Sequence, residues 1–124
     1  MSLKSYKELK VWQKAIELAI ATYTVTKNFP KEELYGLTSQ IRRSAFAIPA
    51  NIAEGYSRRY LAEYIQFLRI AFSSGAELET HLLIANKVGL LKDSDFLRLN
   101  SELSEIMRML NVLMDKLGKS KPKT

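Results

Sequence analysis

Seven apolar residues in the C-terminal part of the sequence recur at alternating intervals of three and four residues. They are Phe96, Leu99, Leu103, Ile106, Leu110, Leu113 and Leu117. An average spacing of about 3.5 residues keeps one side of a helix against a partner helix that crosses it with a left-handed twist. This seam therefore predicts a long helix inside a bundle, capped at its start by Asp93 or Ser94 and ended by Gly118.

Two preceding segments carry apolar stripes with helical spacing. In the third segment of the chain the stripe is Leu61, Tyr64, Leu68, Ala71, Gly75, Leu78, Leu82 and Ala85. Glycine in a helix interior costs about 1 kcal/mol relative to alanine, so Gly75 indicates close packing of a neighbouring helix. In the second segment the stripe is Leu37, Ile41, Ala45, Ile48 and Ile52. Pro49 interrupts this stripe, and because a proline inside a helix costs about 3 kcal/mol, it predicts a kink.

The first segment has more apolar surface than one set of neighbours requires. One stripe consists of Leu9, Trp12, Ile16, Ala19 and Tyr23, with Ile20 beside it. A second, weaker stripe consists of Val11, Ala15, Leu18, Thr22 and Val25. Together they cover more than half of the helix circumference, whereas an outer helix of a monomeric bundle usually has a narrower apolar band. We therefore expect contact with a second copy of the chain; the alternative is a face of small residues tolerated in solvent.

The four segments and the short connections between them predict an all-α fold. We expect an antiparallel up-and-down four-helix bundle, with the second helix kinked at Pro49, that assembles as a homo-oligomer. No alternating apolar pattern of the kind that strands have competes with this interpretation. In a chain of 124 residues we expect one bundle domain at residues 1–117 and a disordered basic tail at residues 118–124.

The net charge of +6 is unevenly distributed along the chain. The tail contributes Lys119, Lys121 and Lys123, and the second segment and its end contribute Arg42, Arg43, Arg58 and Arg59. Arginine forms bidentate contacts with phosphate, so these basic residues are candidate contacts to nucleic acid. The alternative for the tail is a solvated segment that only aids solubility.

A polar ribbon runs along one side of the second segment. Its members, spaced by three or four residues, are Gln40, Arg43, Ala47, Asn51, Glu54 and Arg58. Arg43 and Glu54 are three helical turns apart, so each is expected to meet groups on another helix or another chain. The ribbon predicts either an arginine–carboxylate network at a subunit contact or a phosphate-binding surface. Arg42 and Arg59 lie off this network and are interpreted as solvated.

Residues suited to metal or covalent chemistry are scarce. The chain has no cysteine, and its one histidine, His81, has Glu77 as the nearest acidic residue at helical spacing. We therefore expect no metal site, no cofactor and no enzymatic activity. No apolar run is long enough for a membrane span, and the N-terminus lacks the apolar stretch of a signal peptide. A cytoplasmic location without membrane contact is expected.

The chain contains, in this order, WQKAIEL, FPKEELYGLTSQIRR, IPANIAEG, YIQFLRIA and GAELETHLLIA. With these stretches it resembles the bacterial four-helix-bundle family named for the intervening sequences of 23S ribosomal RNA. The resemblance is close over residues 5–92 and extends to the fourth segment only by pattern. The accessory protein of diversity-generating retroelements looks like a more distant relative.

The resemblance implies a four-helix bundle, a ring of five chains in some relatives, and no demonstrated enzymatic chemistry. For the retroelement accessory protein it implies binding of a reverse transcriptase and of nucleic acid through a basic surface. The positions of structural interest carried over by motif are Gln40, Arg43, Pro49, Asn51, Glu54 and Gly55. Tyr60 stands where relatives often have a small polar residue, which leaves Ser57 as the candidate cap of the third helix.

Two hypotheses of function follow. In the first, a non-enzymatic homo-oligomer, a pentamer by resemblance, associates with RNA through its arginines and its lysine tail. Binding of that kind is expected to depend on salt and hardly on nucleotide sequence. In the second, the oligomer is a scaffold for a partner protein, has no nucleic-acid binding of its own, and uses the arginines to hold its interface.

Overall fold

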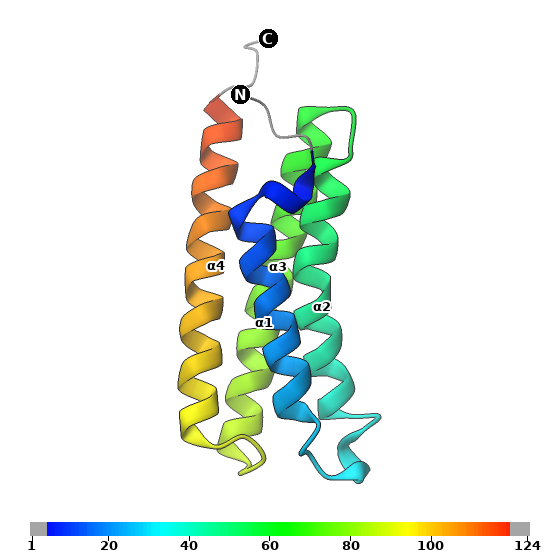
Figure 1. The fold of residues 1–124 in the computed structure, drawn as a ribbon, viewed down its shortest axis with the longest axis vertical. Coiled ribbons are helices and arrows are strands. Elements are labelled where there is room, and N and C mark those ends of the chain that lie inside the picture. The colour runs from blue at the N-terminus through cyan, green and yellow to red at the C-terminus, as the bar shows by residue number, and fades with distance from the viewer. Residues whose placement is uncertain (1–4, 120–124) are drawn as a thin grey trace.

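The computed structural model describes residues 5–119, and its four α-helices are joined by short connections. The helices are α1 Lys10–Thr26, α2 Leu37–Tyr56, α3 Leu61–Lys87 and α4 Asp93–Lys119, with two 3-10 turns, η1 Tyr6–Glu8 and η2 Lys31–Glu33. The helices alternate in direction (Figure 1), and α1 and α3 each contact both α2 and α4. The expected all-α fold with four helices is confirmed, and the described range contains no strand.

The core lies between the four helices and is built from the predicted stripes of α2, α3 and α4. Its buried apolar members from these stripes are Ile41, Ala45, Ile48, Ile52, Leu68, Ala71, Leu78, Leu82, Ala85, Leu99, Leu103, Ile106 and Leu110. Burying one leucine or isoleucine side chain contributes about 1.5–3 kcal/mol, so these residues supply most of the driving force for folding. The heptad seam is confirmed as the core-facing side of α4, with Phe96, Leu113 and Leu117 partly buried at its ends.

Helix α1 reverses the predicted roles of its two stripes. The stripe that the sequence marks as weaker faces the core, with Val11, Ala15, Leu18 and Thr22 buried. The other stripe lies at the edge of the core. Its Ala19 is buried, Leu9, Trp12 and Ile16 are partly buried, and Tyr23 is 41% exposed, while Ile20 beside it is 62% exposed. The buried members of the core-facing stripe are small or β-branched except for Leu18, which is the one large side chain among them.

Two glycines lie at tight contacts between helices. A Cβ atom added to Gly55 of α2 would lie 2.7 Å from Cβ of Phe67 and 3.1 Å from the carbonyl oxygen of Tyr64, both in α3. A Cβ atom added to Gly75 of α3 would lie 3.1 Å from Cγ and Sδ of Met107 in α4. The close packing predicted at Gly75 is confirmed. At Gly55 the tight contact also buries Tyr64, which raises the pKa of its phenol to about 12.

The helix ends differ from the predictions at three places. Helix α3 begins after Tyr60, which makes no side-chain capping bond, and Ser57 instead ends α2, with its hydroxyl donating to the Ala53 carbonyl at 2.9 Å. Ser57 is therefore not the cap of α3. Asp93 lies inside α4, and its carboxylate accepts a hydrogen bond from the Asn86 amide at 2.7 Å. Helix α4 also includes Gly118 and Lys119, two residues beyond its predicted end.

Pro49 lies within α2, which is assigned as one helix from Leu37 to Tyr56. The ring of Pro49 is buried, and nearby the Asn51 side-chain amide donates to the Ala47 carbonyl at 2.8 Å. The kink expected at Pro49 stays a prediction. Of the expected tail, residues 120–124 lie outside the described residues, so its disorder also stays a prediction.

The two tight glycine contacts should respond differently to alanine. Gly55→Ala places a methyl group against backbone and Cβ atoms that cannot move away, so we expect it to lower the free energy of unfolding by about 1–3 kcal/mol. Gly75→Ala meets the flexible end of Met107 and gains about 1 kcal/mol of helix propensity, so its net effect should be within about 1 kcal/mol of zero. Urea denaturation followed by circular dichroism measures both. Equal losses in the two variants would contradict this account of the α2–α3 contact.

Candidate nucleic-acid interface

The polar ribbon of α2 is solvent-facing at Gln40, Arg43 and Glu54. Arg43 has no ion pair with an acidic side chain among residues 5–119. Glu54 was expected to reach another helix or chain, but its carboxylate pairs with Arg58, four residues later, at 3.3 Å. Within the described chain Glu54 thus pairs with Arg58, which follows the end of α2, and its expected contact with another chain stays a prediction. The ribbon therefore leaves Arg43 as an exposed cation with room for an external anion.

Arg42 is not solvated as the sequence suggested. Its Nε donates a hydrogen bond to Oγ1 of Thr26 at 2.9 Å, and its guanidinium carbon lies 4.2 Å from the centroid of the Tyr23 ring. The Tyr23 ring in turn stacks on Phe46 of α2 at a centroid distance of 6.2 Å. Arg42 therefore joins α2 to the end of α1. Sequence reasoning missed this role because both partners belong to another helix.

The other two candidate arginines lie at the α2–α3 turn. The guanidinium carbon of Arg58 is 4.6 Å from the ring centroid of Phe67, and that of Arg59 is 6.0 Å from the ring centroid of Tyr60. Both side chains belong to exposed residues. Arg59 has no acidic partner within the described part of the chain, whereas Arg58 shares its charge with Glu54.

The structure does not bring the basic candidates into one patch on a single chain. Arg42 and Arg58 are 16 residues apart, which corresponds to about 24 Å along a helix. Lys119 ends α4 and pairs with Asp115 at 3.1 Å. Lys121 and Lys123 lie outside the described residues. The candidate cations predicted from the sequence therefore lie apart within the described part of one chain.

A face of apolar side chains, here called the α1–α2 apolar face, lies on the outside of these two helices. It consists of Trp12, Ile16, Ala19, Ile20, Tyr23 and Phe46. Two adjoining hollows of about 330 and 320 Å³ lie on it and share Ile16, Ala19 and Phe46. Tyr23 is 41% exposed. The sequence predicted surplus apolar surface on the first helix, but the contribution of Phe46 was not predicted.

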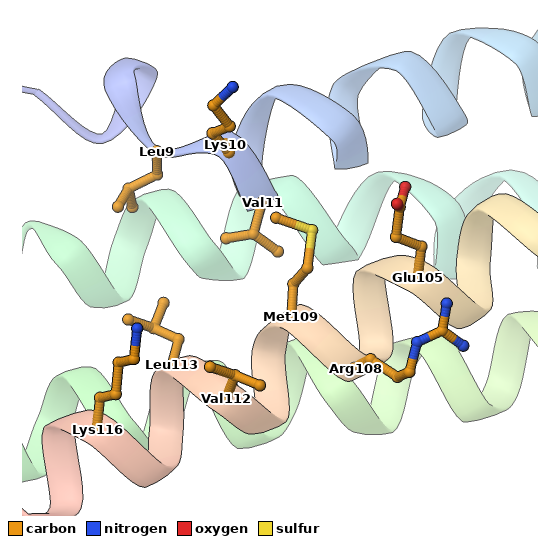
Figure 2. A pocket seen from close by; sticks show the side chains of 9 residues that line it. All are labelled: Leu9, Lys10, Val11, Glu105, Arg108, Met109, Val112, Leu113 and Lys116. Carbon is orange, nitrogen blue, oxygen red and sulfur yellow. The ribbon is translucent and has the colours of Figure 1, made fainter.

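A groove of about 540 Å³ lies between the start of α1 and the C-terminal half of α4 (Figure 2). Its apolar lining is Leu9, Val11, Met109, Val112 and Leu113, and its charged lining is Lys10, Glu105, Arg108 and Lys116. Lys14 pairs with Glu105 at 3.0 Å, and this hydrogen bond and charge raise the pKa of Lys14. The groove joins the two ends of the sequence, so no local motif could have revealed it.

Residues 5–119 contain no group of three histidine, cysteine, aspartate or glutamate side chains that could hold a metal ion. His81 is half-buried, and its Nδ1 has no hydrogen-bond partner. The buried hydroxyls of Thr22 and Thr38 also lack partners. An unsatisfied buried polar group costs about 1–3 kcal/mol, so such positions are unusual. None of the helices in the described range has the length and hydropathy needed to cross a bilayer.

Comparison with known proteins identifies similar sequences and a similar structure. A family model described as 23S rRNA-intervening sequence protein matches residues 7–112. Among solved structures, the chain is similar to a protein with unknown function from the S23 ribosomal protein family of Bacteroides thetaiotaomicron. The two share 25% sequence identity and a TM-score of 0.76, over 84% of this chain and 97% of the other. No curated protein matches the sequence.

The adjacent arginines Arg42 and Arg43 allow a direct test of their different environments. Arg42→Ala removes the hydrogen bond to Thr26 and the contact with Tyr23, so we expect the free energy of unfolding to fall by about 1–2 kcal/mol. Arg43→Ala alters an exposed side chain and should change the free energy of unfolding by less than about 0.5 kcal/mol. Thermal and urea unfolding of the two variants give the comparison. Equal stabilities would mean that Arg42 does not fasten α2 to α1.

Proposed function

The chain belongs to the 23S rRNA-intervening sequence protein family, and from this premise we propose that it is a non-enzymatic, homo-oligomeric bundle that associates with RNA. The family description names no catalytic activity. The observation that carries the proposal is the exposure of Arg43 and Arg59, neither of which has an acidic partner among residues 5–119. A guanidinium group in that situation is available to pair with a phosphate through two parallel hydrogen bonds.

Assembly is the second part of the proposal and is supported by the α1–α2 apolar face. A protein that stays monomeric rarely exposes a contiguous patch of large apolar side chains, and such patches usually bind another protein surface. The face lies beside the exposed Arg43, so copies that pack through it would bring cations from several chains near one another. Five copies of a chain with net charge +6 would together carry +30. Weak phosphate contacts then add through avidity.

The expected mode of binding follows from the separation of the cations. Each chain offers isolated arginines rather than a cleft that reads base edges, so the contacts would be to phosphates and would carry little sequence information. Such binding releases counterions and therefore weakens steeply with added salt. On a duplex, log K falls by about 0.9 for each neutralised phosphate when the salt concentration rises tenfold. The proposed function is therefore general association with RNA, with no chemical step.

A scaffold for a partner protein is the second candidate, and the groove between α1 and α4 favours it. The groove has an apolar floor and a rim with Lys10 and Arg108 (Figure 2), which is the chemistry that accepts an acidic amphipathic helix. In this candidate the arginines of α2 hold the oligomer together. Arg43→Glu would then dissociate the assembly, whereas under the first candidate it would weaken RNA binding and leave the assembly intact.

A pair of exposed apolar residues tests the assembly. Ile20→Glu introduces a charge into the α1–α2 apolar face and is expected to shift the protein to monomers. Leu97→Glu makes the same change on α4 and should leave the assembly unaltered; Leu97 is 64% exposed, close to the 62% of Ile20. Sedimentation velocity at micromolar concentration measures the size of each species. A wild-type protein that is already monomeric, or equal behaviour of the two variants, would contradict the proposal.

RNA association is tested with arginine variants at two salt concentrations. Replacing Arg43 and Arg59 with glutamine should weaken binding of a structured, fluorescently labelled RNA. The slope of log K against the logarithm of the salt concentration should become shallower by about one unit for each phosphate that is no longer neutralised. Arg98→Gln is the control because Arg98 lies on α4 beside Asp95, at 4.0 Å. Fluorescence anisotropy gives the affinities. Absence of binding at low salt, or binding that added salt does not change, would remove this function.

A further inference from the structure

A small cavity of about 190 Å³ lies where the α1–α2 connection, residues 27–36, folds over the start of α2. Its polar lining is Thr26, Lys27, Lys31, Thr38 and Arg42, and its apolar lining is Phe29, Pro30 and Leu34. Pockets for whole drug-sized ligands usually measure about 300–1,000 Å³, so this cavity fits one chemical group rather than a nucleotide. The residues proposed above to contact RNA, Arg43 and Arg59, do not line this cavity, so that function does not explain its cations.

Three of the lining residues are cations. None of Lys27, Lys31 and Arg42 forms an ion pair with an acidic side chain in the described range. Arg42 is held in place, because its Nε donates to Thr26 at 2.9 Å and its guanidinium group lies over the Tyr23 ring. These contacts use one of the five N–H donors of the guanidinium group and leave the terminal nitrogens for a further acceptor. Charge and geometry at this position therefore suit an anion.

The first turn of α2, from which Thr38 lines the cavity, has unpaired backbone donors. The amide of Gln40 is the first to bond back within the helix, to the Gly36 carbonyl, so the amides of residues 37–39 have no acceptor inside α2. Gly36 supplies no side-chain cap, and the first turn contains no acidic residue. No side chain of the first turn itself compensates the positive end of the helix dipole, and helix N-termini of this kind bind anions.

The last carbonyls of the neighbouring helix α1 already accept hydrogen bonds. Its last carbonyls would repel an anion, but those of Tyr23, Val25 and Thr26 accept hydrogen bonds from the amides of Lys27, Asn28 and Phe29 at 3.1–3.3 Å. The acidic side chain of Glu33 does approach the start of α2: its Oε1 lies 3.9 Å from the position of a Cβ atom on Gly36. It makes no hydrogen bond there, so it does not replace a cap.

Thr38 provides an independent indication of a ligand. It lies in the first turn of α2, lines the cavity and is only 3% exposed, and its hydroxyl has no hydrogen-bond partner. Buried hydroxyls are almost always hydrogen-bonded, so an unpartnered hydroxyl on a residue that lines the cavity points to an acceptor that is missing there.

We propose that this cavity binds the phosphate group of a phosphate monoester. Three cations and a helix N-terminus match the dianion of a monoester better than the single charge of a carboxylate or of a backbone phosphodiester. The same group occurs on small phosphorylated molecules and at the 5′ end of an RNA. Binding of an RNA 5′-phosphate rests on the proposed RNA association, and it would give the chain a preference for RNA with a phosphorylated 5′ end.

The direct test is a titration of full-length protein with inorganic phosphate at about pH 8, where the group is a dianion, at constant ionic strength. Nuclear magnetic resonance follows the amides of residues 37–39, with chloride as the reference anion.

We expect saturable shifts and about tenfold weaker binding in Lys31→Gln, because this variant removes one charge-assisted hydrogen bond. Thr38→Val should also weaken binding, while Lys87→Gln, a charge-matched control at the end of α3, should bind as the wild type does. Shifts that chloride reproduces, or that Lys31→Gln leaves unchanged, would overturn the site.

A second experiment distinguishes the two sources of the phosphate group, a small molecule and an RNA 5′ end. It also tests the phosphate site separately from the proposed RNA association. Anisotropy compares one RNA with a 5′-phosphate against the same RNA with a 5′-hydroxyl. Tighter binding of the phosphorylated end, lost in Lys31→Gln, assigns the site to RNA ends; equal binding of the two RNAs together with saturable binding of inorganic phosphate assigns it to a small phosphorylated molecule. If RNA does not bind but phosphate does, the proposed function fails and the site stands. If RNA binds and phosphate does not, the site fails and the proposed function stands.

Discussion

Close packing between the four helices is the constraint on which the rest of the structure depends. Interiors are packed as densely as organic crystals, so facing side chains must fill the space between the helices. In α1 the side chains that do so are Val11, Ala15, Leu18 and Thr22. Trp12 lies partly buried at the edge of this core, whereas Ile20 and Tyr23 are exposed. The α1–α2 apolar face is the part of these two helices that the core does not cover.

This constraint also explains what the sequence could and could not predict. Heptad spacing identified the core side of α4 because leucines and isoleucines fill that seam without competition. On α1 two stripes compete, and hydrophobicity alone ranks the bulkier one first, whereas in the structure the other stripe, with Leu18 among smaller residues, faces the core. The role of Gly55 was carried by resemblance, and its physical reason, a Cβ position 2.7 Å from Phe67, needs the position of α3.

The candidate site was harder to predict than the fold, because charges acquire roles from neighbours that are distant in sequence. Arg42 and Arg43 are adjacent and chemically identical, yet one is fastened to Thr26 and Tyr23 while the other is exposed. A polar ribbon drawn from spacing alone directed Glu54 to another helix or another chain, whereas within the described chain it pairs with Arg58, four residues later. The groove between α1 and α4 and the cavity at the start of α2 each combine residues from separate elements, so no contiguous motif encodes them.

The most direct test of the central claim uses Trp12, the only tryptophan of the chain, which lies on the α1–α2 apolar face. If another copy covers this face, acrylamide should quench Trp12 fluorescence less in the assembled protein than in monomers obtained by dilution or by a charge on the face, and emission should shift to the red as the monomer forms. Quenching that is identical in wild-type protein and in a verified monomer would contradict the account, because the outward residues of α1 would then remain in water.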